Sequence, residues 1–151
     1  MIQRKQSVFL LLSIISSAIC MFLPIGRFVS ENMGADSVFY NIAIKSMDGS
    51  MNYVVCVLFI LLLIQALISL FTIFMFKKRP FQSKCCKLNM VLLVAWYAAY
   101  TYFAFTAGSE GTTFHISFCA ALPLISLVFL VLANMGIRSD EELVRSMDRI
   151  R

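Results

Sequence analysis

The five cysteines are the residues of this sequence best suited to chemistry. Cys20, Cys56 and Cys119 lie within long apolar segments, whereas Cys85 and Cys86 are adjacent in the basic stretch FKKRPFQSKCCKLN. A metal site or a thiol redox centre needs several paired ligands or a C-x-x-C spacing, and the sequence contains neither. The five cysteines therefore make no disulfide framework, and we interpret Cys85 and Cys86 as reduced interfacial thiols. Acylation of these two juxtamembrane cysteines is the alternative. The sequence predicts no catalytic residue, no cofactor-binding residue and no metal site.

The single histidine, His115, is the next candidate for chemistry. It stands at the boundary of an apolar segment with no second ligand or acid–base partner near it in the sequence. Catalysis and metal binding both require such a partner. We therefore interpret His115 as an interfacial side chain.

Stripes of small and polar residues run along the apolar segments at helical spacing. Ser13 and Ser17 belong to the first stripe, Gln65 and Ser69 to the second, and Asn134 to the last segment. Helices in lipid pack through such stripes. A polar conduit for a small molecule or lipid is the alternative, but ion coupling and proton relays normally require an ionisable residue in the span. We predict that these five residues face the interior of a bundle.

Aromatic residues crowd the third apolar segment, where Trp96, Tyr100 and Phe103 share one helical face. Some of this crowding is typical of an interfacial belt. The shared face favours a packed interface, and stacking of a flat apolar ligand such as a quinone is the alternative.

The composition shows which elements must position these residues. The chain is 60% hydrophobic and 14% charged, with a mean hydropathy of +0.85, whereas a soluble domain is about half apolar and about a quarter charged. Segments without an ionisable side chain are long enough to cross a hydrocarbon core of about 30 Å, and lipid requires them to be helical. We predict an all-α membrane protein, a four-transmembrane-helix bundle with spans at about 8–25, 53–76, 88–107 and 116–136.

Basic residues are distributed unevenly between the predicted loops. Eleven of the thirteen lie before the first span, in the turn 77–87 or after the last span, and only Arg27 and Lys45 lie elsewhere. The positive-inside rule then predicts that both termini and the turn 77–87 are cytoplasmic. The net charge of +5 therefore fits lipid headgroups and not nucleic acid.

The outer loop 26–52 contains a strand pattern. SVFYNIAIKS, residues 37–46, alternates with period two and is rich in β-branched and aromatic residues, and GRFVS, residues 26–30, is able to pair with it. We predict a small β-hairpin on the outer side, with Asn32–Gly34 as its turn. The second outer loop, 108–115, is predicted to be short and flexible.

The tail SDEELVRSMDRIR, residues 139–151, has the pattern of a short amphipathic helix. Ser139 and Glu142 form a capping box, and Gly136 permits a bend before it. Such a helix could lie on the membrane surface, dock under the bundle or bind a partner. The candidate partner-binding residues are the apolar Leu143, Val144, Met147 and Ile150, with the basic Arg145 and Arg149 beside them.

Three passages, MIQRKQSVFLLL, SKCCKLNMVLL and the ending LPLISLVFLVLANMGIRSDEELVRSMDRIR, resemble a family of small bacterial membrane proteins called domain of unknown function 4293. The resemblance covers essentially the whole chain. It implies a four-span protein of the cytoplasmic (inner) membrane of Gram-negative bacteria, with a variable outer loop. It implies no catalytic or binding residue.

These observations together predict a non-enzymatic membrane protein that serves as an assembly, interaction or structural subunit. Its expected partners are membrane lipids and another membrane or cytoplasmic protein held by the tail. The first alternative is a carrier or pore for a small molecule or lipid, built on the polar stripes. The second is a membrane thiol or quinone enzyme, which the lack of cysteine in both outer loops disfavours.

Overall fold

The computed structural model describes residues 3–30, 36–46, 49–75, 79–108 and 112–148. Four long helices, two short 3-10 helices and five strands make up this part of the chain. The helices are α1 (Gln3–Phe22), η1 (Tyr53–Val55), α2 (Cys56–Phe74), α3 (Arg79–Thr106), η2 (Phe118–Ala121) and α4 (Leu122–Asp148). The strands are β1 (Pro24–Ser30), β2 (Ser37–Tyr40), β3 (Ile44–Ser46), β4 (Met51–Asn52) and β5 (Thr112–Ile116).

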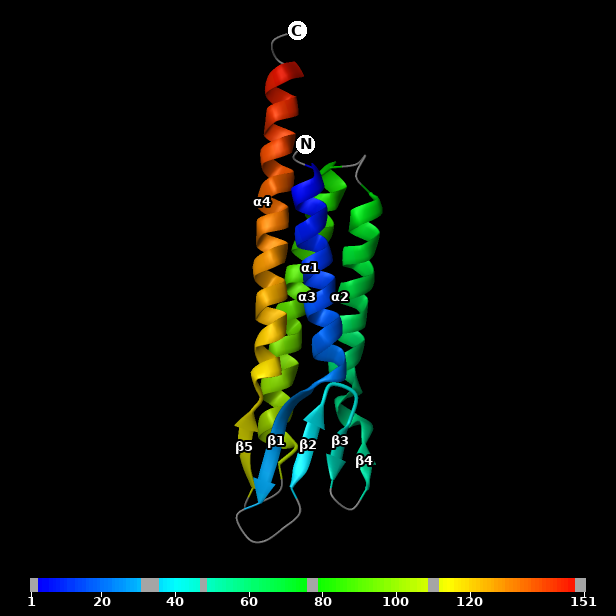
Figure 1. Cartoon of the computed structure of the whole chain (residues 1–151), viewed down its shortest axis with the longest axis vertical. Helices are drawn as coiled ribbons and strands as arrows, with labels where there is room; N and C mark the ends of the chain where they lie inside the picture. Colours follow the sequence, from blue (N-terminus) through cyan, green and yellow to red (C-terminus); the bar gives the residue numbers. More distant parts are fainter. Residues whose placement is uncertain (1–2, 31–35, 47–48, 76–78, 109–111, 149–151) are drawn as a thin grey trace.

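The four long helices run side by side, and the strands gather at one end of them (Figure 1). Each helix packs against two others, since α1 and α3 both contact α2 and α4. Three helical stretches are long and apolar enough to cross a membrane: Tyr53–Phe74, Phe81–Thr106 and Phe118–Glu141. The first helix has a shorter apolar stretch, Gln6–Phe22.

The outward faces of the helices are apolar and their shared interior is partly polar. Large apolar side chains such as Val8, Leu67, Val91 and Val128 are exposed, whereas Gln65 is completely buried. A soluble bundle has the opposite arrangement. Helices that pack in lipid adopt this one, because the surrounding chains are as apolar as leucine and only the interior needs polar or small residues. The fold is therefore membrane-compatible and mostly helical.

The strands form one antiparallel sheet in the order β4-β3-β2-β1-β5. The predicted pairing of residues 26–30 with the following strand is present, because Arg27 lies opposite Val38. The predicted single strand 37–46 is instead divided into β2 and β3, because the chain turns at Asn41 and Tyr40 N donates to Ala43 O (3.0 Å). The predicted turn Asn32–Gly34 lies outside the described residues.

The prediction that loop 108–115 is flexible was wrong for its second half. Residues 112–116 form β5, which pairs with β1 so that Gly26 lies opposite Ile116 and Arg27 opposite His115. Gly26 allows the close approach of the two strands, since a Cβ at that position would lie 2.5 Å from Phe114 Cζ. Strand β5 therefore joins the two loops of this end into one sheet (Figure 1).

Two boundary predictions at the other end also need correction. The predicted turn 77–87 is much shorter, because α3 already begins at Arg79. Pro80 does not break this helix, since the first turn of a helix tolerates proline. The tail is not a separate helix either, because α4 continues unbroken from Leu122 to Asp148. Gly136 marks a close contact and not a bend: a Cβ there would lie 3.0 Å from Gln6 Cγ.

Candidate functional site

Hydroxyl groups connect the middle of α1 to the first turns of α4. Ser13 Oγ lies 2.6 Å from Ser126 Oγ, and Ser17 Oγ lies 3.0 Å from the same atom. Ser126 Oγ also lies 3.2 Å from the carbonyl oxygen of Ser13, and Ser16 Oγ donates to Leu122 O at 2.8 Å. The small side chains let the two helices approach closely, and their hydroxyls then satisfy one another.

Amide groups extend this network to α2 and α3. Gln65 Nε2 donates to Ser13 Oγ (3.3 Å) and to Ser69 Oγ (3.1 Å), and Asn89 Nδ2 donates to Ser69 Oγ (2.9 Å). We call Ser13, Ser17, Gln65, Ser69, Asn89 and Ser126 the interior network; all six are completely buried. Gln65 Oε1 and Asn89 Oδ1 accept no hydrogen bond from the described residues.

A second set of polar contacts lies nearer the chain termini. Gln6 Nε2 donates to Asp140 Oδ2 at 2.6 Å, and both side chains are buried. Ser83 Oγ donates to Asn134 Oδ1 at 2.8 Å, and Gln82 Nε2 donates to Thr72 O at 3.3 Å. The predicted interior residue Asn134 is therefore half-buried between α3 and α4, apart from the interior network.

The predicted partner-binding residues lie at the far end of α4. The last two turns of the helix include four of them: Leu143, Val144, Arg145 and Met147. Ile150 and Arg149 fall outside the described residues. Figure 1 shows that α4 continues beyond the ends of the other three helices. The hydrogen bond from Gln6 Nε2 to Asp140 Oδ2 joins α4 to α1 near the base of this projecting end.

The aromatic residues of α3 pack against the sheet and not only against helices. Trp96, which is 0% exposed, stacks on Tyr100 with ring centroids 5.2 Å apart, and Tyr100 stacks on Phe39 of β2 at 5.9 Å. Phe114 of β5 meets Tyr100 edge-on at 6.1 Å. Because Phe39 and Trp96 both stack on the Tyr100 ring, these residues form a packing interface between α3 and the sheet.

One buried amide joins this stack to α1. Asn41 Nδ2 donates to the carbonyl oxygen of Cys20 (2.6 Å), and Asn41 Oδ1 accepts from Trp96 Nε1 (3.1 Å). Asn41 is completely buried. In the sequence, Asn41 is only one position of the alternating pattern of residues 37–46. Its position inside a run of β-branched and aromatic residues was a signal that this amide is buried. A buried amide must find hydrogen-bond partners.

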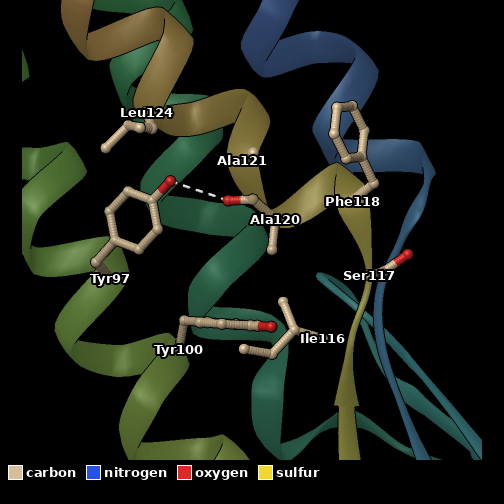
Figure 2. A pocket seen from close by; sticks show the side chains of 8 residues that line it. All are labelled: Tyr97, Tyr100, Ile116, Ser117, Phe118, Ala120, Ala121 and Leu124. Carbon is tan, nitrogen blue, oxygen red and sulfur yellow. Dashed lines mark hydrogen bonds between the residues drawn. The ribbon is translucent and has the colours of Figure 1, made fainter.

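A groove of about 620 Å³ opens where α3 and α4 meet β5 (Figure 2). Tyr97 Oη donates to Ala120 O at 2.9 Å across its floor, and Tyr100 Oη donates to Ile25 O at 3.0 Å. Phe118 at its edge is 87% exposed. The other lining residues are mostly apolar or small: Ile116, Ser117, Ala121 and Leu124. The groove is suited to an apolar chain, since its two phenol groups already donate to backbone carbonyls.

The cysteines remain free and dispersed. Cys86 is completely buried within α3 and so does not lie in the predicted turn. Cys20 is completely buried near the C-terminal end of α1. Among the described residues, no group of three or more histidine, cysteine or acidic side chains is placed to hold a metal ion. His115 is exposed on β5, opposite Arg27.

A comparison with protein-family models matches residues 2–150 to the family described as Domain of unknown function (DUF4293). This match covers nearly the whole chain and confirms the resemblance that the two ends and the passage around Cys86 indicated. No curated protein matches the chain significantly. The family description names no activity, so any function must come from the geometry.

Proposed function

Since the chain belongs to the DUF4293 family, whose description carries no activity, we propose a function from its geometry: a non-enzymatic, four-span protein of the inner membrane of a Gram-negative bacterium that assembles with a protein partner. The partner binds the projecting end of α4 on the cytoplasmic side. Membrane lipids surround the helices. The proposal assigns no reaction, cofactor or nucleic acid.

The positions of the termini and the sheet support this topology. The N- and C-terminal ends of the described chain lie at one end of the helices, and all five strands lie at the other (Figure 1). Strand β1 follows the first helix and β5 follows the third, so their pairing requires both loops on one side. That side has few basic residues, whereas Lys84, Lys87 and Arg138 lie toward the termini. The positive-inside rule then favours cytoplasmic termini.

The observation that carries the proposal is the unbroken α4. An isolated helix as short as the tail would be marginal in water, because nucleation is costly. Here the tail continues a long helix that is already nucleated, and the Gln6–Asp140 hydrogen bond holds its base. The projecting turns are thus a preformed binding element, and a partner pays little entropy to use them. A groove that accepts a helix is the matching partner surface.

Site-specific photo-crosslinking in the native membrane tests this proposal. We would place the photoreactive side chain at Leu143 or Met147, and at Val128 as the control, which is exposed within the apolar stretch Phe118–Glu141. A discrete protein adduct at both tail positions, with only lipid adducts at Val128, is the expected result. Lipid adducts at all three positions would contradict the proposal. A chain that ends after Glu141 should lose the same partner on purification.

The groove beside Tyr97 favours a second candidate, the binding of a lipid or another apolar small molecule. Its volume of about 620 Å³ is within the range of small-molecule sites. A carrier built on the polar stripes receives less support, because the hydroxyls of the interior network bond to one another. Native mass spectrometry distinguishes a lipid site in the groove from a carrier built on the polar stripes. If the site is the groove, Ala121→Phe, which fills the groove, should remove a bound lipid, and Gln65→Leu should not.

A further inference from the structure

The two basic residues of the sheet end lie in one row across the outer face of the sheet. His115, Arg27, Val38, Lys45 and Met51 are consecutive cross-strand partners on β5, β1, β2, β3 and β4. Paired residues point to the same face of a sheet, and neighbouring strands are about 4.8 Å apart. Arg27 and Lys45 therefore flank Val38 from strands separated by roughly 10 Å.

This row faces away from the helices. Arg27 and Lys45 are exposed, while their neighbours Phe28 and Ile44 are buried on the opposite face. The alternation is that of a sheet with one packed and one wet face. The two exposed cations therefore flank Val38, and both are long enough to contact one anion bound above it.

A pocket of about 330 Å³ lies between them. Val38 and Tyr40 of β2 lie on the same face as the two cations, so Tyr40 adds a hydroxyl group to the lining, and Asp36 adds a carboxylate. Two cations and one carboxylate give the lining of the pocket a net positive charge. The register of the strands therefore places Arg27 and Lys45, the two permanently charged cations of the sheet, beside one pocket.

We propose that this pocket binds the phosphate group of a small anionic molecule on the outer side of the membrane. Phosphate suits it better than carboxylate, since its tetrahedrally arranged oxygens match donors that come from three strands. Arginine binds phosphate oxygens bidentately, lysine supplies a point charge, and the Tyr40 hydroxyl adds a donor from the strand between them. The volume is near the lower limit of ligand pockets, which restricts the molecule to a phosphate and a small attached group.

Two sources can supply this phosphate group, a soluble phosphate ester and the headgroup of a membrane lipid. Titration calorimetry with the full chain in nanodiscs distinguishes them, with inorganic phosphate as the probe. In nanodiscs made of a glycolipid, which carries no phosphate, we expect saturable phosphate binding. If nanodiscs that also contain phosphatidylglycerol abolish this binding, the lipid headgroup is the occupant. If they leave it unchanged, the occupant is soluble.

Substitutions decide whether the binding belongs to this pocket. Arg27→Gln and Lys45→Gln should each weaken phosphate binding about tenfold, because each removes a charge-assisted hydrogen bond. Lys45→Arg should retain it. Lys87→Gln is the matched control, because Lys87 is an exposed cation of α3 away from the sheet. The thermal unfolding midpoint identifies variants that fail to fold. Absence of saturable binding to the unaltered chain, or equal losses from Lys87→Gln, would overturn the proposal.

Discussion

The interior network and the junction between α3 and the sheet bury polar groups for opposite reasons. Between the helices, serine hydroxyls and two amides bond to one another, and the apolar side chains face outward. At the junction, Trp96, Tyr100 and Phe39 form an apolar stack, and the amide of Asn41 serves only to complete it. Lipid gives apolar side chains no reason to turn inward, whereas water near the sheet does. The chain therefore uses a different cohesive interaction in each region.

Replacing Trp96 by alanine should give the largest effect, since it removes the centre of the junction. The side chain is 0% exposed and stacks on Tyr100. We expect a loss of about 3–5 kcal/mol in the free energy of unfolding. Unfolding in mixed detergent micelles measures it, and Trp96→Phe should lose less. If Trp96→Ala costs less than Ser126→Ala in the free energy of unfolding, this contrast between the junction and the interior network is wrong.

Replacing Asn41 by leucine should follow in size. The change strips the indole Nε1 of Trp96 and the carbonyl oxygen of Cys20 of their partner. We expect a cost of about 1–3 kcal/mol, because buried groups left without a hydrogen bond are costly. Hydrogen exchange should rise in β1 and β2 and remain low in α2. Ile42→Ala is the control, because Ile42 is exposed beside Asn41.

Replacing Ser126 by alanine should cost less than either junction change, although Ser126 contacts both Ser13 and Ser17. Side-chain hydrogen bonds between helices in lipid contribute about 0.6 kcal/mol on average, so we expect a loss of about 0.5–1.5 kcal/mol. A double-mutant cycle with Ser13→Ala isolates the pair. Zero coupling energy would show that close packing alone, without these hydroxyls, joins α1 to α4.

Replacing Gln65 by leucine should give the smallest effect. Its amide nitrogen makes two long hydrogen bonds, its oxygen accepts none from the described residues, and Ser69 keeps the donor from Asn89. We expect a change of no more than about 0.5 kcal/mol in either direction. Micelle unfolding would measure this change as well. A loss above about 2 kcal/mol would mean that the oxygen holds a buried water or other donor, and it would restore weight to a polar conduit.

Local signals predicted part of this architecture. The apolar segments and their lack of charge located the helices, and the alternation after Ser37 located β2 and its pairing with β1. Polar stripes at helical spacing predicted that Gln65 and Ser69 face the interior of the helix bundle, and both side chains are buried there. These signals succeed because each depends on residues that are close in the sequence.

Contacts between distant residues escaped the sequence analysis. Strand β5 contains only five residues, and its partner β1 lies more than eighty positions earlier. A glycine such as Gly136 permits a bend as far as the local sequence shows, and nothing near it in the sequence reveals that Gln6 packs against it. Gln6 and Asp140 likewise meet from opposite ends of the chain. Such contacts depend on how the helices are arranged, which no local pattern contains.

The pairing of β1 with β5 has a consequence for the biogenesis of the protein. Ribosomes deliver β1 long before β5, so the β1 edge waits unpaired until the third helix and the following loop have emerged. In the proposed topology, only a chain whose loops have reached the same compartment closes the sheet. In a chain with one crossing too few, the edges of β1 and β5 that pair with each other would stay bare, and bare strand edges are templates for aggregation. Under that topology, closure of the sheet would therefore depend on complete membrane insertion.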